Sequence, residues 1–208
     1  MTEINTDDIL NGYINGIFPM AESDGAIYWY SPNPRAVIPI DTYKPSKSLR
    51  PVLNKKYFEI KIDTDFEGVM RGCSGPRVNE QGTWISESII AAYTSLHRLG
   101  YAHSVESYRE GKLVGGLYGV SINGVFFGES MFSRESNASK VAFHYLMQLL
   151  KFNHFVLLDT QFMNDNVLRY GAIEIPRDEY LDLLQKALKV KRRFDAGVLA
   201  DLSLHKPS

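Results

Sequence analysis

Hydrophobic residues recur along the chain in short runs whose spacing predicts alternating helices and strands. Near the start they return every three or four positions, which predicts a short amphipathic helix capped by Thr6. A short aromatic run then predicts a strand, and an extended stretch at 35–40 follows a proline-rich turn. Pro39 indicates that this stretch is an edge strand. We therefore expect a small N-terminal domain of residues 1–40 and a larger domain of residues 41–208.

The next part of the chain alternates between helical and extended patterns. Ser46 is a candidate helix cap, and alternation over 58–62 predicts a half-buried strand. A short helix is expected over 65–72, and a longer helix begins after Ser86 and ends at Gly100.

The second half of the chain predicts a β-meander followed by helices and strands. Three strands are expected between 102 and 132, because the Glu110-Gly111 and Asn123-Gly124 turns that separate them are hairpin signals. The elements that follow are a helix over 138–150, strands over 155–159 and 171–175, and a helix after Pro176. This order predicts an α+β protein, a mixed sheet flanked by helices and preceded by a small N-terminal unit.

Composition agrees with a globular protein: 44% of the residues are hydrophobic and 23% are charged. No apolar run approaches the roughly 20 residues of a membrane helix, and the acidic start is unlike a secretory signal. Cys73 is the single cysteine, which excludes an intramolecular disulfide. We therefore expect a monomeric protein of the cytoplasm with no membrane partner.

Charge is unevenly distributed along the chain. The formal net charge of −1 argues against a protein that coats nucleic acid indiscriminately. Basic residues nevertheless cluster over 44–61 and again over 186–193. Either cluster alone is ordinary solvated surface, but two of them on a neutral chain are typical of a protein that docks one folded RNA. In the first cluster the candidate contacts to an RNA backbone are Lys47, Arg50, Lys55 and Lys56.

The strand predicted over 126–132 contains a carboxylate among bulky apolar residues. Strict alternation places Glu129 on one face together with Phe127 and Met131. An unpaired carboxylate is expensive to bury. We therefore favour a paired site residue over the alternative, an edge strand with Glu129 in solvent.

Two further polar groups lie at predicted element ends. The start of the helix at 138 offers free N–H groups and polar side chains, a candidate phosphate cradle, although routine helix capping explains part of it equally well. Its side chains are Ser133, Arg134, Asn137, Ser139 and Lys140. Asp159 and Gln161 share one face of a predicted strand end. From spacing alone, an Asp that caps a turn is the simpler interpretation of this pair.

Nine segments of the chain together resemble the leucyl/phenylalanyl-tRNA–protein transferases, in that family's order and with similar spacing. They are Gly16–Pro19, Trp29–Arg35, Gly82–Ile85, Ala102–Glu106, Leu113–Val120, Phe127–Ser133, Asn137–Lys140, Asp159–Gln161 and Gly171–Arg177. The resemblance implies an enzyme that moves Leu or Phe from aminoacyl-tRNA to the N-terminal Arg or Lys of acceptor proteins and so marks them for N-end-rule degradation. It also implies a catalytic domain like that of the GCN5-related N-acetyltransferases. Because the ester is already activated, we expect no cofactor, no metal and no ATP.

The resemblance also implies roles for particular residues. Gln161 accepts a hydrogen bond from the attacking amine, and Asp159 orients Gln161. Because a partly desolvated guanidinium needs a carboxylate and Asp159 is engaged with Gln161, we expect Glu129 to pair with the cationic acceptor residue. Asp159 and Gln161 lie at a strand end, where replacement is expected to leave the fold intact. The aminoacyl pocket is formed by Met131, Phe126, Phe127, Phe132 and Gly128. Contacts to the 3′ end of the tRNA are expected from Trp84, which stacks on a base, and from the cradle residues named above.

The chain departs from the family pattern at two site positions. Met20 stands where many members have tryptophan, and Asn166 stands where a histidine is frequent. Two other functions remain open, an N-acetyltransferase that uses acetyl-CoA and a non-catalytic module that binds tRNA or protein N-termini. The segment 133–138 lacks the glycines of an acetyl-CoA loop, which argues against the first.

Overall fold

The computed structural model describes residues 4–22, 24–75 and 84–198. Its elements in chain order are α1 (Thr6–Ile14), β1 (Phe18–Ala21), β2 (Ile27–Tyr30), β3 (Arg35–Ile38), α2 (Arg50–Asn54), β4 (Glu59–Ile62), α3 (Phe66–Cys73), α4 (Glu87–Arg98), β5 (Ala102–Arg109), β6 (Lys112–Ile122), β7 (Val125–Ser133), α5 (Ala138–Phe152), β8 (Leu157–Gln161), α6 (Asp165–Arg169), β9 (Ile173–Ile175), α7 (Arg177–Leu188) and a 3₁₀ turn (Ala196–Val198). The helices and strands expected from hydrophobic spacing are present, whereas β1 and α6 were not predicted.

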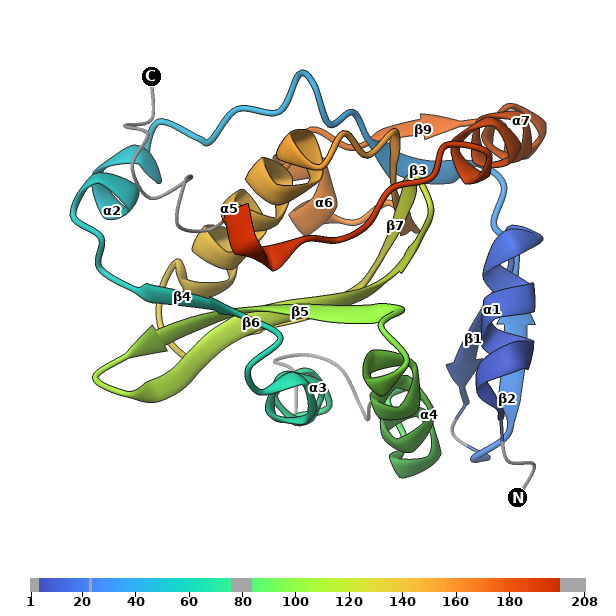
Figure 1. Cartoon of the computed structure of the whole chain (residues 1–208), viewed down its shortest axis with the longest axis horizontal. Coiled ribbons are helices and arrows are strands. Elements are labelled where there is room, and N and C mark those ends of the chain that lie inside the picture. Colours follow the sequence, from blue (N-terminus) through green and yellow to red (C-terminus); the bar gives the residue numbers. More distant parts are fainter. Residues whose placement is uncertain (1–3, 23, 76–83, 199–208) are drawn as a thin grey trace.

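Seven strands form one mixed sheet in the order β4-β5-β6-β7-β8-β3-β9. Its neighbouring strands are antiparallel except for β7 and β8, which run parallel. Helices α3 and α4 cover one face, and α5 and α6 cover the other (Figure 1). The predicted α+β class, a small N-terminal unit followed by a mixed sheet flanked by helices, is confirmed.

Local signals account for several element boundaries. The Ser86 side chain accepts a hydrogen bond from the Ile89 N–H and caps α4, as predicted. Two of the other predicted caps are wrong. Asn5 rather than Thr6 caps α1, and α2 begins at Arg50 without any side-chain cap, so Ser46 has no such role.

Strand β3 lies inside the main sheet, between β8 and β9. The interpretation of 35–40 as an edge strand is therefore wrong. Pro39 follows Ile38, the last residue of the strand, so its missing N–H removes no hydrogen bond from the ladder. The part of the chain that stands beside the sheet is α1 with the β1–β2 hairpin (Figure 1).

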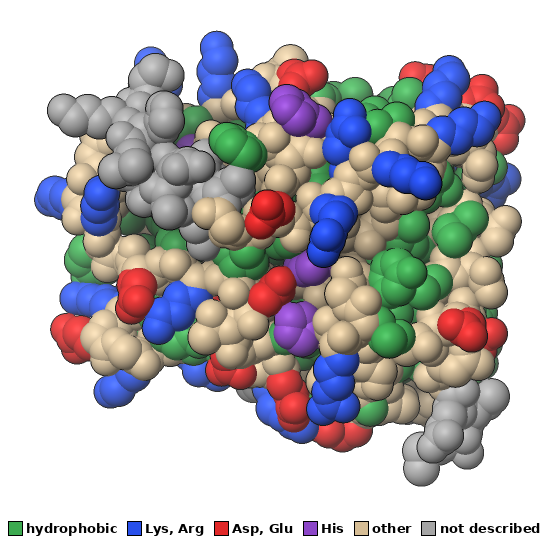
Figure 2. Space-filling model, in the orientation of Figure 1, with side chains coloured by type: hydrophobic (Ala, Val, Ile, Leu, Met, Phe, Trp, Pro, Cys, Tyr) green, Lys and Arg blue, Asp and Glu red, His purple; other side chains and the backbone are tan. Residues whose placement is uncertain are grey.

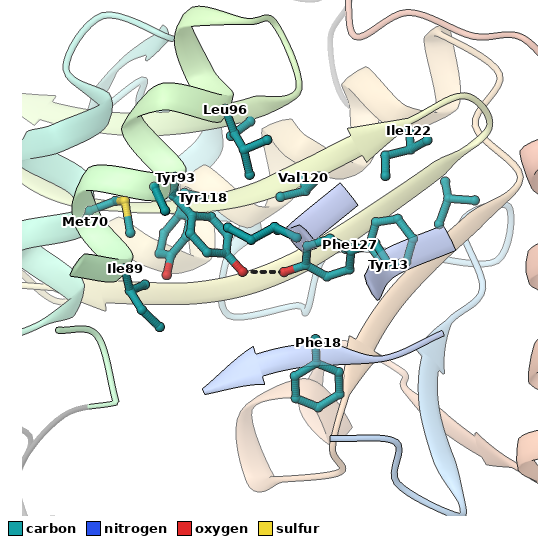
Figure 3. Packing of buried hydrophobic residues seen from close by; sticks show 14 of the residues in the cluster. Tyr13, Phe18, Met70, Ile89, Tyr93, Leu96, Tyr118, Val120, Ile122 and Phe127 are labelled. Carbon is teal, nitrogen blue, oxygen red and sulfur yellow. Dashed lines mark hydrogen bonds between the residues drawn. The ribbon is translucent and has the colours of Figure 1, made fainter. Parts of the chain in front are cut away.

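Two large hydrophobic clusters fill the two sides of the sheet. The first contains buried residues of α1, α3, α4 and α7, and Figure 3 shows Tyr13, Tyr93 and Phe127 within it. The second lies under α5 and includes Phe126 and Met147. Because α1 and α7 contribute to the first cluster, the N-terminal unit shares its core with the sheet.

The start of α3 is held by a buried carboxylate of β5. One oxygen of Glu106 accepts hydrogen bonds from the backbone N–H groups of Thr64 and Asp65 and from the Ser104 hydroxyl. Burial raises the pKa of Glu106. This anchor places α3 over β6 and β7, where its last turn contributes to the cavity described below.

Within the described ranges, no helix has the length and apolar character needed to cross a membrane.

Candidate active site

A fully buried ion pair joins β3 to β8. Arg35 donates from Nε to Asp159 Oδ1 at 2.9 Å and from Nη2 to Oδ2 at 2.6 Å, and the side chains are 1% and 0% exposed. A third arginine nitrogen donates to the Gly16 carbonyl at 3.2 Å, and the guanidinium lies over the rings of Phe18 and Tyr180. This two-pronged geometry with additional hydrogen bonds is what a buried charge pair requires.

The Asp159 carboxylate accepts two further hydrogen bonds. The Tyr180 hydroxyl donates to Oδ2 at 2.7 Å, and the Gln161 backbone N–H donates to Oδ1 at 2.9 Å. An Asp that caps a turn, the simpler interpretation of the spacing, therefore describes part of this arrangement. The carboxylate also neutralises a buried arginine, which argues against the expectation that Asp159 can be replaced without disturbing the fold.

Gln161 is held in an unusual backbone conformation next to Asp159. Its φ is +65°, a left-handed value that residues other than glycine rarely adopt. The side-chain Nε2 donates to Glu129 Oε1 at 2.8 Å. A carboxylate oxygen can accept only from the NH₂ end of the amide, so this contact determines which way the amide points. Among the described residues, none donates a hydrogen bond to the amide oxygen of Gln161.

Glu129 occupies a β-bulge of β7. Its neighbours Gly128 and Ser130 pair with consecutive residues of β6, so Glu129 is the extra residue between them. The prediction that Glu129 shares a face with both Phe127 and Met131 is wrong, because the bulge interrupts the alternation. Phe127 packs in the first hydrophobic cluster, and Met131 packs against the second.

Two fully buried tyrosines, Tyr13 of α1 and Tyr93 of α4, lie against the Glu129 carboxyl group. The Tyr13 hydroxyl donates to Oε1 at 2.6 Å and the Tyr93 hydroxyl lies 3.4 Å from Oε2. The two hydroxyls also bond to each other, as the dashed line in Figure 3 shows. Burial raises the pKa of both phenols well above the usual value, so both remain protonated donors. A tyrosine among the apolar residues of a helix needs a hydrogen-bond partner for its buried hydroxyl. This requirement is the feature of the sequence that could have indicated both tyrosines as site residues.

The environment of Glu129 shifts its titration into the neutral range. Burial raises the pKa of its carboxyl to about 7, and the charge of Asp159 acts in the same direction. The hydrogen bonds from Tyr13, Gln161 and Tyr93 favour the charged form and oppose this rise. Near neutral pH the site therefore contains a partly protonated carboxyl group, and a bound cation would favour its ionised form.

A cavity of about 690 Å³ opens beside this network. Glu129 forms part of its wall, together with Thr160 of β8. Its apolar lining residues are Leu117, Met131, Phe132, Phe143, Leu146, Leu158 and Val167. Gly128, Met131 and Phe132 thus lie where the aminoacyl pocket was expected. Phe126 and Phe127 do not line the cavity, because both are fully buried in the core.

The candidate phosphate cradle lies partly at this cavity. Ser133 and Arg134 line it, and the Arg134 guanidinium rests over the Phe132 ring. Helix capping by the Asn137 side chain, the alternative explanation of this segment, is absent, since Asn137 has a left-handed backbone and makes no side-chain cap. The Ser139 N–H instead donates to the Ser133 hydroxyl at 3.3 Å. Lys140 is exposed and lies 3.4 Å from the Asn137 side chain.

Other candidate residues lie away from the cavity or at its rim. Trp84 does not line the cavity and packs, half-buried, against the first cluster, while Gly82 and Thr83 lie outside the described residues. Asn166 does line the cavity. Arg71 of α3 was not singled out from the sequence, yet it lines the cavity, where Glu67 and Glu87 hold it at 2.8 and 3.1 Å.

The four basic candidates for RNA contact are exposed on and around α2, and none of them lines the cavity. They are Lys47, Arg50, Lys55 and Lys56. On the face drawn in Figure 2, Lys and Arg side chains are interspersed with Asp and Glu. This face is therefore not uniformly basic, and any RNA contact there is local.

Comparisons with known proteins identify close relatives. Residues 37–185 match the family model described as leucyl/phenylalanyl-tRNA protein transferase, and residues 2–33 match the model of that family's N-terminal domain. A protein of Chlorobaculum tepidum with the same description is 53% identical over 192 residues, which cover 92% of this chain and 99% of the relative. A protein of Gloeobacter violaceus is 50% identical over 187 residues, covering 89% and 95%. Among solved structures, L-PGS from Bacillus licheniformis aligns with a TM-score of 0.40 and 13% identity, over 80% of this chain and 56% of that one.

Proposed function

Because the chain belongs to the leucyl/phenylalanyl-tRNA–protein transferase family, we propose that it moves leucine or phenylalanine from aminoacyl-tRNA to the N-terminal Arg or Lys of an acceptor protein. The observation that carries this proposal is a cavity with an apolar lining whose wall contains Glu129, which is hydrogen-bonded to Gln161. The cavity suits an apolar amino-acid side chain, and the polar network offers groups for an amine.

The reaction needs little chemistry from the protein. The neutral α-amine attacks the ester carbon, a C–N bond forms, and the C–O bond to the tRNA ribose breaks. The amine proton finally leaves on the ribose oxygen or to water. An α-amine has a pKa of about 7.7–8.0, so a useful neutral fraction exists near pH 7. Holding amine and ester in attack geometry can supply roughly 7–11 kcal/mol.

Gln161 is the group that orients the amine. Its amide oxygen accepts a hydrogen bond from the attacking nitrogen, while Nε2 stays bonded to Glu129. Asp159 is a positioning residue and not a base, because its oxygens are occupied by Arg35, Tyr180 and the Gln161 N–H.

Glu129 recognises the charged side chain of the acceptor. Its Oε1 takes two short hydrogen bonds, whereas Oε2 has one longer contact, to Tyr93 at 3.4 Å, and is the oxygen with capacity for a guanidinium or ammonium group. A bound cation favours the ionised form of a carboxyl whose pKa is about 7.

The aminoacyl side chain enters the cavity between Met131 and Phe132, where a flexible thioether adapts to either Leu or Phe. Ser133 and Arg134 at the same cavity, with Ser139 and Lys140 beyond it, contact the 3′ end of the tRNA. Trp84 stacks on a terminal base from outside the cavity. One chain contains all of these groups, so we propose a monomer that works in the cytoplasm, where charged tRNA is found.

The decisive experiment supplies the protein with radiolabelled leucyl-tRNA and a peptide that begins with Arg, without ATP or acetyl-CoA. Label should appear in the peptide. The same peptide beginning with Ala is the matched control and should stay unlabelled. Acetylation of the peptide from acetyl-CoA, with no label leaving leucyl-tRNA, would exclude the proposed function.

A further inference from the structure

One buried charge in the molecule takes no part in the proposed chemistry. Arg35 is 1% exposed and lies on β3, which pairs with β8, the strand that ends in Gln161. Its guanidinium donates four hydrogen bonds: two to Asp159 on β8, one to the Gly16 carbonyl between α1 and β1, and one to the Tyr180 hydroxyl on α7. It therefore ties the N-terminal unit and the C-terminal helix to the end of the catalytic strand.

The contacts of Arg35 converge on the backbone of Gln161. Asp159 Oδ1 receives both the Arg35 Nε and the Gln161 N–H, each at 2.9 Å. The two-pronged contact with the guanidinium and the hydrogen bond from Tyr180 orient the carboxylate that accepts this N–H. The N–H belongs to a residue with φ +65°, a conformation that persists only where the surroundings determine it strongly.

We propose that Arg35 is a positioning residue for the transfer reaction. It fixes the Asp159 carboxylate, which holds Gln161 in its left-handed conformation and so aims the amide at the amine. The inference rests on the proposed role of Gln161 and goes beyond it by naming the group that sets its geometry.

An arginine suits this task better than a lysine. The guanidinium presents two parallel N–H groups to one carboxylate and a third to the Gly16 carbonyl, whereas an ammonium is a compact point charge on a flexible stem. Arg35→Lys keeps the charge that neutralises Asp159 but loses the fork. The substitution therefore separates positioning of the carboxylate from simple charge compensation.

The test is a double-mutant cycle on the single-turnover rate at saturating leucyl-tRNA and Arg peptide. Arg35→Lys should lower the rate roughly ten- to a hundredfold in the native background, since a misplacement of about 1 Å can cost about 100-fold. In the Gln161→Ala background the same change should alter the rate by no more than about twofold, the usual scatter of independent effects. The KM for leucyl-tRNA should stay unchanged in all four proteins.

A matched control is Arg177→Lys. Arg177 also bonds a backbone carbonyl of the N-terminal segment, that of Ser31, but it is exposed and makes no contact with Asp159. It should leave the rate unchanged. Tyr180→Phe removes only the hydroxyl that donates to Asp159 Oδ2, so it tests the same coupling if Arg35→Lys does not fold.

Equal losses in the native and Gln161→Ala backgrounds, for Arg35→Lys and for Tyr180→Phe, would reduce Arg35 to a structural residue and overturn the inference. An unchanged rate in Gln161→Ala alone is a different result. It would remove the hydrogen-bond acceptor from the proposed function and take the premise of this inference with it.

Discussion

At the residue scale, Asp159 and Gln161 lie two positions apart and yet have different surroundings. Asp159 has no exposed surface and neutralises Arg35. Gln161 lies next to a carboxyl group of the cavity wall, and its amide oxygen accepts no hydrogen bond from the part of the chain that the structure describes. The first residue should therefore matter for stability and geometry, and the second for the rate of transfer.

Asp159→Asn should lower the free energy of unfolding by roughly 3–5 kcal/mol, because it leaves a buried arginine uncompensated. Gln161→Ala should cost much less stability and should lower the single-turnover rate while leucyl-tRNA affinity stays nearly constant. Urea denaturation and single-turnover kinetics of both variants measure the difference. An Asp159→Asn protein with native stability would show that the ion pair is weaker than its geometry indicates.

Glu129→Gln keeps the shape of the side chain and deletes its charge. It should raise the KM for Arg- and Lys-starting peptides, since losing one partner of a desolvated charge pair costs roughly 2–5 kcal/mol. Leucyl-tRNA affinity should be nearly unchanged. A folded variant with the native peptide KM would exclude Glu129 from acceptor recognition.

The same variant should change how stability depends on pH. The folded pKa of Glu129 is about 7 against a usual 4.5, so between these values the folded state binds more protons than the unfolded state. The free energy of unfolding therefore falls as pH rises through this window, by at most about 3 kcal/mol and by less where solvent screens the carboxylate. Glu129→Gln should flatten this part of the profile. Melting curves at pH 4.5, 6 and 7.5 measure the effect, and identical profiles for both proteins would contradict the raised pKa.

At the element scale, the exposed basic residues of the 44–61 segment lie on and around the short helix α2. Val52 and Leu53 of α2 are partly buried against a small hydrophobic cluster, while Arg50 is exposed. A helix of this kind can carry charge at little cost in stability, which suits contact with an RNA backbone.

Replacing Lys47, Arg50, Lys55 and Lys56 together by Gln should weaken tRNA binding and flatten its dependence on salt. Each lost phosphate contact should reduce the slope of log K against log salt by about 0.7–0.9. Filter binding at several salt concentrations gives the slope. Changing Lys112 and Lys151, two exposed lysines outside both basic clusters, to Gln separates a local contact from a general charge effect. A slope unaltered by the α2 substitutions would return this cluster to ordinary surface.

At the scale of the whole molecule, the N-terminal unit contacts the candidate site through hydrogen bonds and a ring contact, that of Phe18 with Arg35. The Tyr13 hydroxyl of α1 donates to Glu129, and the Gly16 carbonyl accepts from Arg35. The unit is therefore part of the site, and a change within it should be visible in the pH dependence of transfer.

Tyr13→Phe removes a hydrogen bond that lowers the pKa of Glu129, so this pKa should rise further. The acid limb of kcat/KM for Arg peptides should then move to higher pH. The peptide α-amine titrates nearby and gives a limb of its own, which the substitution should not move. The shift should therefore disappear in a Glu129→Gln background, and a shift of the same size there would assign it to another group.

The sequence by itself determined the class of fold and the order of most elements. Asn-Gly and Glu-Gly turns impose hairpins, a Ser at position 86 satisfies the first N–H groups of α4, and periodic apolar residues require a buried face. These signals are local, because each depends on residues within a few positions of one another. The resemblance over nine segments added the chemistry, since it pointed to Asp159, Gln161 and Glu129 together.

The tertiary structure alone decided which side chains meet at the site. The bulge at Glu129 arises where β7 pairs with β6, and the left-handed backbone of Gln161 is held by a hydrogen bond to the carboxylate of Asp159. Arg35 is 124 positions from Asp159, and Tyr13 is 116 positions from Glu129. Neither periodicity nor spacing can connect residues at such separations, because their proximity is created by the packing of α1 and β3 against the sheet. The buried charge and the two hydroxyls were detectable in the sequence only as polar groups that needed partners, and the fold supplied those partners.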